Sequence, residues 1–138
     1  MILRRAVVAD IDRAMPMLRR VLSAQPHGMV IDENKLRVTA LRTITHGYCA
    51  VAEYDGKIVA YIAGLVDENP YFERLQLTVI GWYSEAPGAG FRLYRMMMKW
   101  RDANPMIGSV CLLANPDEKL NRIMVRHGAI PMPSYWIP

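Results

Sequence analysis

Gly88 and Gly90 form the feature of the sequence that points most clearly to chemistry. They lie in segment 85–92 (EAPGAGFR), between a strand-like run from Leu75 to Tyr83 and a helix-like run from Phe91 to Ala103. Glycines let the backbone come close to a ligand, and the first turn of a helix leaves backbone N–H groups without intrahelical partners. Such a junction binds anions, so we expect a phosphate-bearing ligand here.

Three kinds of phosphate-binding loop join a strand to a helix through glycines. A Walker A loop needs Gly-Lys-Ser/Thr, but Gly90 is followed by Phe91 and Arg92, so no side chain is placed to hold terminal phosphates and magnesium. A Rossmann loop needs a third small residue where Leu93 stands, and the upstream segments are typical of a hairpin rather than of a βαβ unit. The pattern therefore disfavours both.

The segment resembles the third kind, the pyrophosphate loop of the GNAT superfamily of N-acetyltransferases. That loop has the pattern Gln/Arg-x-x-Gly-x-Gly/Ala between a strand and a helix. Gly88 and Gly90 match its two small positions, whereas Glu85 stands where Gln or Arg is usual, and the loop is shorter than is typical. The order of elements resembles that family over nearly the whole chain. The resemblance implies an α/β (α+β) fold, with a central mixed, mostly antiparallel sheet flanked by helices.

The resemblance also implies an activity and a set of binding residues. GNAT enzymes transfer an acetyl group directly from acetyl-CoA to a primary amine. In the family, the end of the strand before the loop contacts the pantetheine arm, and the loop amides hold the pyrophosphate. Asn115 could also reach the pantetheine, although capping of the last helix explains it equally well. The remaining positions implied to bind acetyl-CoA are Trp82, Tyr83, Ser84, Gly88, Ala89, Gly90, Phe91 and Arg92.

Direct acetyl transfer is helped by an acid that protonates the departing thiolate. Family members often supply this acid as a tyrosine in the last helix. Met124 stands at that position, and a thioether cannot donate a proton. Tyr135, Tyr83 or water could take this role.

The reaction also needs a base to take the proton from the incoming amine. Glu73 is our candidate, and no pattern separates it from the alternatives Glu53, Asp67 and Glu85. His27 lies in a loop expected to border the acceptor groove.

The elements that must position these residues follow from apolar periodicity and turn signals. Asp55-Gly56 predicts a hairpin turn. Asp10 can cap the first helix, and Pro16 should either kink or split that helix. Segment 131–138 is expected to be the last strand of the sheet. We predict the other strands over 2–6, 48–54, 57–66, 74–84 and 107–113, and helices over 8–24, 32–45, 91–103 and 115–127.

Length and composition predict one domain spanning residues 1–138. Of these residues, 52% are hydrophobic and 22% charged, which is typical of a protein with a real core. No apolar run approaches the roughly 20 residues that span a bilayer, so we expect a cytoplasmic protein without a membrane partner. Cys49 and Cys111 lack metal-site spacing and lie in apolar runs, so we expect two buried thiols and no metal site.

The formal charge of +4 comes from basic residues scattered along the chain, without a nucleic-acid-binding signature. It favours a solvated surface that weakly attracts anions such as coenzyme A. No motif identifies the acceptor, which is either a small molecule or a protein amine, and a homodimer is left open. The alternative function is a catalytically impaired GNAT-like domain that binds a protein or a nucleic acid.

Overall fold

A mixed sheet forms the middle layer of the computed structural model, which describes residues 1–24, 28–112 and 118–132. Its strands are adjacent in chain order. β1 to β4 pair antiparallel, and β5 joins β4 in parallel. The strands are β1 (Ile2–Arg5), β2 (Gly47–Tyr54), β3 (Lys57–Glu68), β4 (Leu75–Ser84) and β5 (Ile107–Leu112).

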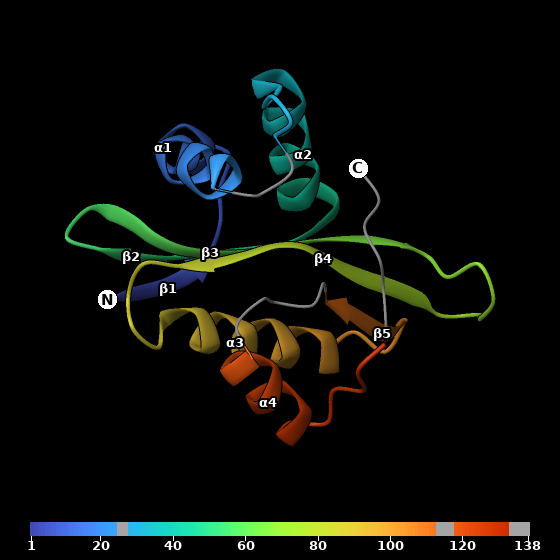
Figure 1. Ribbon diagram of the computed structural model, residues 1–138. Helices are drawn as coiled ribbons and strands as arrows, with labels where there is room; N and C mark the ends of the chain where they lie inside the picture. Colours follow the sequence, from blue (N-terminus) through green and yellow to red (C-terminus); the bar gives the residue numbers. More distant parts are fainter. Residues whose placement is uncertain (25–27, 113–117, 133–138) are drawn as a thin grey trace.

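Helices cover both faces of this sheet. The first pair lies on one face and the second pair on the other (Figure 1). This arrangement confirms the predicted fold class. The helices are α1 (Asp10–Ser23), α2 (Glu33–His46), α3 (Ala89–Asp102) and α4 (Glu118–Arg126).

The predicted elements are present with small differences. α3 begins at Ala89, two residues earlier than predicted. α1 continues through Pro16, so the alternative of a split helix is wrong; Pro16 lies on the exposed side, where losing one backbone donor is tolerated. The predicted last strand at 131–138 lies mostly outside the described residues. Cys49 is buried, but Cys111 is exposed on β5, the last strand of the described sheet, so the prediction of two buried thiols is wrong for Cys111.

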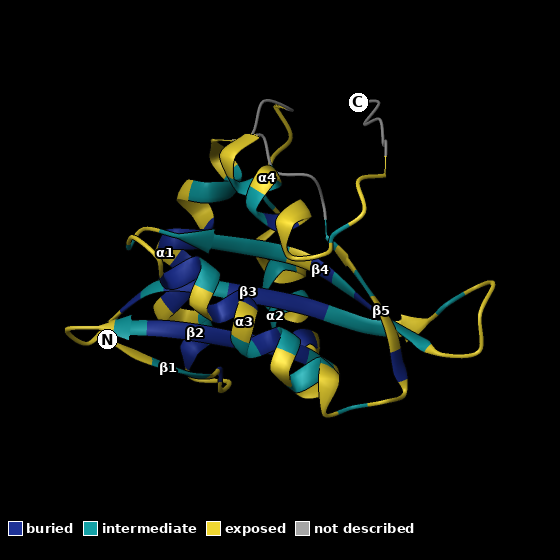
Figure 2. Cartoon of the chain, turned by 90° about the horizontal axis from the view of Figure 1, so that it is seen from below, coloured by how far each residue is buried: buried dark blue, intermediate teal, exposed yellow. Residues whose placement is uncertain are grey.

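The core lies on both faces of the central strands, which are buried along most of their length (Figure 2). Along β2, Tyr48, Ala50 and Ala52 pack toward α3, while Cys49 and Val51 pack toward α1. This alternation follows from the two-residue period of a strand. The small alanines allow the helices to pack close to the sheet.

Gly47 connects α2 to β2 without any intervening loop. The helix ends at His46 and the strand begins at the next residue. A Cβ at Gly47 would lie 2.2 Å from the carbonyl oxygen of Gly64 on β3. Only glycine allows the chain to turn from helix to strand so close to its neighbour.

Asp10 does not cap α1, contrary to the prediction, because an ion-pair cluster holds its carboxylate. It accepts hydrogen bonds from Arg4 Nη1 and Nη2 at 2.7 and 2.9 Å, from Arg13 Nη1 at 3.1 Å and from the Val7 N–H at 2.9 Å. The same two arginines hold Glu53 on β2. Asp10 is only 2% exposed, so this cluster fixes the start of α1 to β1 and β2.

We predict that Asp10→Asn lowers the free energy of unfolding by about 2 kcal/mol at pH 7, because charge-assisted hydrogen bonds are lost. The hydrogen bonds from Arg4 lower the pKa of Asp10 from 3.8 to about 2. Its stabilising effect is therefore complete above pH 3.8 and disappears as the pH falls toward 2. Urea titrations between pH 7 and pH 2.5 test this.

Asp12→Asn is the matched control, because Asp12 lies in the first turn of the same helix and its side chain is 80% exposed. We expect Asp12→Asn to lower the free energy of unfolding much less than Asp10→Asn does. An equal loss in the two variants would contradict the role given to Asp10.

Candidate functional site

β4 has two neighbours along its first half and one along its second half. Residues 75–79 pair with β5, whereas, among the described residues, 81–84 pair only with β3. At the point of change, Ala63 pairs with Gly81 and Gly64 with Val79, so Ile80 is an extra residue and forms a bulge. Within residues 1–24, 28–112 and 118–132, the second half of β4 therefore has a free edge, which can bind an extended ligand through its backbone.

The turn after β4 is held by short-range hydrogen bonds. Ser84 Oγ accepts from the Ala86 N–H at 3.2 Å and donates to the Ala86 carbonyl at 2.6 Å. The Glu85 N–H donates to the Val59 carbonyl at 2.8 Å. Gly88 has φ +75°, a left-handed conformation that favours glycine. Together these contacts set the direction in which the chain enters α3.

The start of α3 presents free backbone donors. Within the described part of the chain, the N–H groups of Gly88, Gly90 and Phe91 have no acceptor, and no side chain caps the helix. The dipole of this 14-residue helix adds partial positive charge at the same end. Arg92 is exposed one residue later. This arrangement can bind a phosphate or pyrophosphate.

Gly90 is buried and has a packing role that the motif did not indicate. A Cβ at this position would lie 3.1 Å from Ser84 Cβ and 3.3 Å from Trp82 Nε1. The Trp82 indole N–H donates to the Gly90 carbonyl at 2.9 Å. Gly90 therefore lets α3 lie directly against the end of β4.

The predicted residues of segments 82–84 and 88–92 lie together around this turn. Their side chains point in different directions: Trp82 packs with α3, while Tyr83 packs with Tyr61 on the face covered by α1 and α2. Phe91 stacks on Tyr94, with ring centroids 5.8 Å apart. Ala89 is buried, so its contribution is limited to the backbone.

Glu73 is not brought to the site. It is exposed in the connection before β4, and Leu75, where β4 begins, is already five residues or about 17 Å from the bulge at Ile80. Asn115, Tyr135 and His27 lie outside the described residues.

The alternative carboxylates are also unsuited to act as bases. Glu53 is held by Arg4 and Arg13, whose hydrogen bonds lower its pKa. Glu85 pairs with Arg20 of α1 at 2.6 Å. Asp67 pairs in register with Gln76, near the far end of β4.

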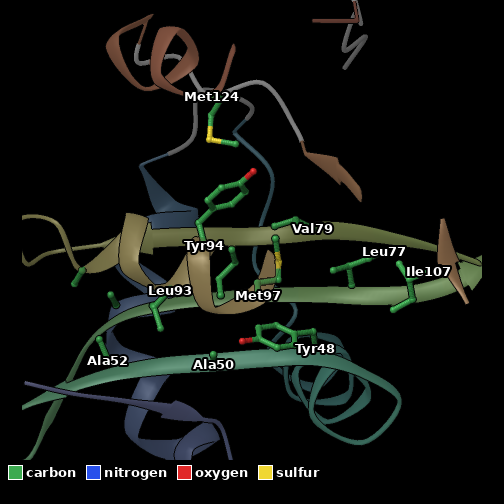
Figure 3. Packing of buried hydrophobic residues seen from close by; sticks show 13 residues of the cluster. Tyr48, Ala50, Ala52, Leu77, Val79, Leu93, Tyr94, Met97, Ile107 and Met124 are labelled. Atoms are coloured by element: carbon green, nitrogen blue, oxygen red, sulfur yellow. The ribbon is translucent and has the colours of Figure 1, made fainter. Parts of the chain in front are cut away.

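Tyr94 is a residue that the sequence did not single out. The residue is 7% exposed, and its ring stacks on Trp82, with centroids 5.5 Å apart. Figure 3 shows its hydroxyl pointing toward Met124 on α4. Burial raises the pKa of Tyr94, so the hydroxyl stays protonated. The two residues are 30 positions apart in the sequence, and no local pattern connects them.

Solved structures with a similar fold include acetyltransferases of the GNAT fold. A ribosomal-protein-alanine N-acetyltransferase from Brucella melitensis biovar Abortus 2308 has a TM-score of 0.75 at 15% identity, with 99% of this chain and 97% of that chain covered. An aminoglycoside acetyltransferase from an uncultured soil metagenomic sample, in complex with sisomicin, has a TM-score of 0.70 at 15% identity, covering 99% and 94%. This chain therefore has the GNAT fold. No family model and no curated protein sequence matches it.

The described residues contain no cluster of three or more His, Cys, Asp or Glu side chains that could hold a metal ion. Within the same ranges, no helix is long and apolar enough to cross a membrane.

The ion pair between Arg20 and Glu85 predicts an effect on anion binding. Glu85 lies three residues before Gly88, so without Arg20 its carboxylate would repel a bound pyrophosphate. We expect Arg20→Ala to weaken the binding of coenzyme A about threefold, in keeping with the small energies of exposed charge pairs. The dissociation constant is measured by calorimetry at low salt.

The double variant Arg20→Ala/Glu85→Gln should regain the original affinity, because the unpaired carboxylate is gone. Arg19→Ala is the matched control, since Arg19 pairs with Glu33 away from the turn. Equal weakening in both single variants would show that only the net charge matters.

Proposed function

We propose that this protein transfers an acetyl group from acetyl-CoA to a primary amine. The observation that carries the proposal is the set of free N–H groups of Gly88, Gly90 and Phe91, placed directly after the free edge of β4. Two neighbours in fold, a ribosomal-protein-alanine N-acetyltransferase and an aminoglycoside acetyltransferase, support this class of reaction.

The residues present fit acetyl-CoA. The backbone of residues 80–84 can pair with the amides of a pantetheine arm, as one strand pairs with another. The amides at the start of α3 suit the pyrophosphate. Acetyl-CoA would supply the acetyl group as a thioester. What this chain adds is alignment of that thioester along β4 and a donor for the departing sulfur.

Tyr94 is the proton donor in this proposal. It replaces the missing tyrosine at position 124, because its hydroxyl points to that place from α3 (Figure 3). Its raised pKa keeps the proton available at neutral pH. Near residues 81–84 of β4, Glu85 is paired with Arg20, while Asp67 and Glu73 lie by the other end of the strand, so in this proposal the amine gives its proton to water.

Arg92→Glu should weaken the binding of acetyl-CoA by about tenfold, because it places a negative charge beside the phosphate site. Lys99→Glu is the matched control, with the same charge change at an exposed position of the last turn of the same helix. Calorimetry at low and moderate salt measures both, and the effect should shrink as salt increases.

Gly90→Glu should abolish binding, because the new side chain meets Ser84 and Trp82 as well as adding charge. The exposed Arg92 variant separates loss of binding from loss of folding. If the unaltered protein bound no acetyl-CoA up to millimolar concentrations, the transferase would be excluded in favour of the alternative, a GNAT-like domain that binds a protein or nucleic acid.

Tyr94→Phe should lower kcat for acetyl transfer by about 100-fold and leave the affinity for acetyl-CoA unchanged, because only the donated proton is lost. Tyr83→Phe and Tyr135→Phe test the two tyrosines predicted from the sequence. Steady-state kinetics with an acceptor found by screening amines provides the measurement. An unchanged kcat in Tyr94→Phe would rule out Tyr94 as the donor.

A further inference from the structure

A cavity of about 170 Å³ lies between α1, α2 and the sheet, on the face opposite α3. Ala14 and Leu18 of α1 and Leu36 and Ala40 of α2 contribute to its walls, and β2 and β3 form its floor. An apolar cavity of about 150 Å³ is large enough to hold benzene. This cavity therefore has room for an apolar group about the size of a phenyl ring.

The cavity reaches the part of β4 where transfer is proposed to occur. Ile80 and Gly81, the bulge residue and its neighbour, both line it. At these residues β4 no longer pairs with β5, so its edge has no partner strand in the described part of the chain. An amine carried by a group in the cavity can reach this edge from the side of α1 and α2.

No charge in the cavity is available to pair with an ammonium group. Among the described lining residues, three can ionise: Asp10, Cys49 and Tyr61. Asp10 is already held by Arg4 and Arg13. Burial raises the pKa of the Cys49 thiol and raises the pKa of Tyr61 to about 12, so both are neutral at pH 7.

The other polar groups of the cavity also supply no charge to pair with an ammonium group. α2 contributes Thr39 and Thr43, which have no charge, and Thr43 Oγ1 already donates to the Ala40 carbonyl at 2.8 Å. Moving an ammonium ion into such surroundings loses its hydration without a compensating partner, whereas a neutral amine loses much less.

We infer that the acceptor is a weakly basic amine, uncharged at pH 7, on an apolar group of about phenyl size, as in an arylamine. The inference rests on the proposed function and adds the class of acceptor to it. In the reaction, the nitrogen lone pair forms a bond to the thioester carbonyl carbon and the carbon–sulfur bond breaks. The nitrogen releases a proton to water, and the sulfur takes one from Tyr94.

The isomers p-toluidine and benzylamine separate charge from shape. They have the same atoms and nearly the same size, but at pH 7 the first is neutral and the second is an ammonium ion. Calorimetric titration of the whole protein, without coenzyme, should show p-toluidine binding at least about tenfold more tightly. Equal affinities, or tighter binding of benzylamine, would overturn the inference.

Two variants of α2 test whether the cavity is the site. Ala40→Phe places a ring in the cavity, and Val38→Phe places the same ring on the surface, since Val38 is 58% exposed. Affinity for p-toluidine should fall at least about tenfold in the first variant and stay unchanged in the second. Full binding by Ala40→Phe would also overturn the inference.

The outcome is distinguishable from failure of the proposed function, because acetyl-CoA is titrated separately. Binding of p-toluidine without binding of acetyl-CoA would exclude the transferase and retain the cavity's preference for a neutral ligand. Binding of acetyl-CoA with no preference between the isomers would retain the transferase and exclude the arylamine class. In Ala40→Phe, retained acetyl-CoA binding also shows that the variant is folded.

Discussion

The whole arrangement depends on how the pairing of β4 is divided between its two neighbours. A strand inside a sheet normally has all its backbone groups satisfied on both sides. β4 meets this condition up to Val79 and then loses β5, while the bulge at Ile80 shifts its register with β3. Residues 81–84 remain paired with β3. Among the described residues their other edge has no partner strand, so its hydrogen-bonding groups are open to an extended, amide-containing ligand.

The position of the anion site follows from the same strand. Because Gly90 has no side chain, α3 starts in contact with Trp82 and Ser84 instead of projecting from the sheet. The free donors of its first turn are thus fixed relative to the open edge. On the other face, α1 supplies Arg20 to the turn, so the face that bears the cavity is also linked to the phosphate site. The turn between β4 and α3 therefore links the edge of β4, the phosphate site and the face that bears the cavity.

Much of this could be predicted from the sequence. The elements were predictable because their signals are local: Asp55-Gly56 for the hairpin and the two glycines for the turn before α3. The roles of individual side chains were not, because they depend on residues distant in the chain. Asp10 was predicted as a cap and instead binds arginines from β1 and α1. Tyr94 meets Met124 only because α3 and α4 lie on the same face.

The direct junction of α2 and β2 determines which end of α2 can move. Thr43, the buried residue of α2, lies one turn before Gly47, and the close contact of Gly47 with Gly64 fixes this end of the helix to the sheet. The other end begins at Glu33, with Val30 and Asp32 exposed before it. Any tilting of α2 must therefore pivot about Gly47 and separate Glu33 from Arg19 of α1, so the beginning of the helix moves most. The cavity would then widen at the start of α2 and keep its width at the end where the helix enters the sheet.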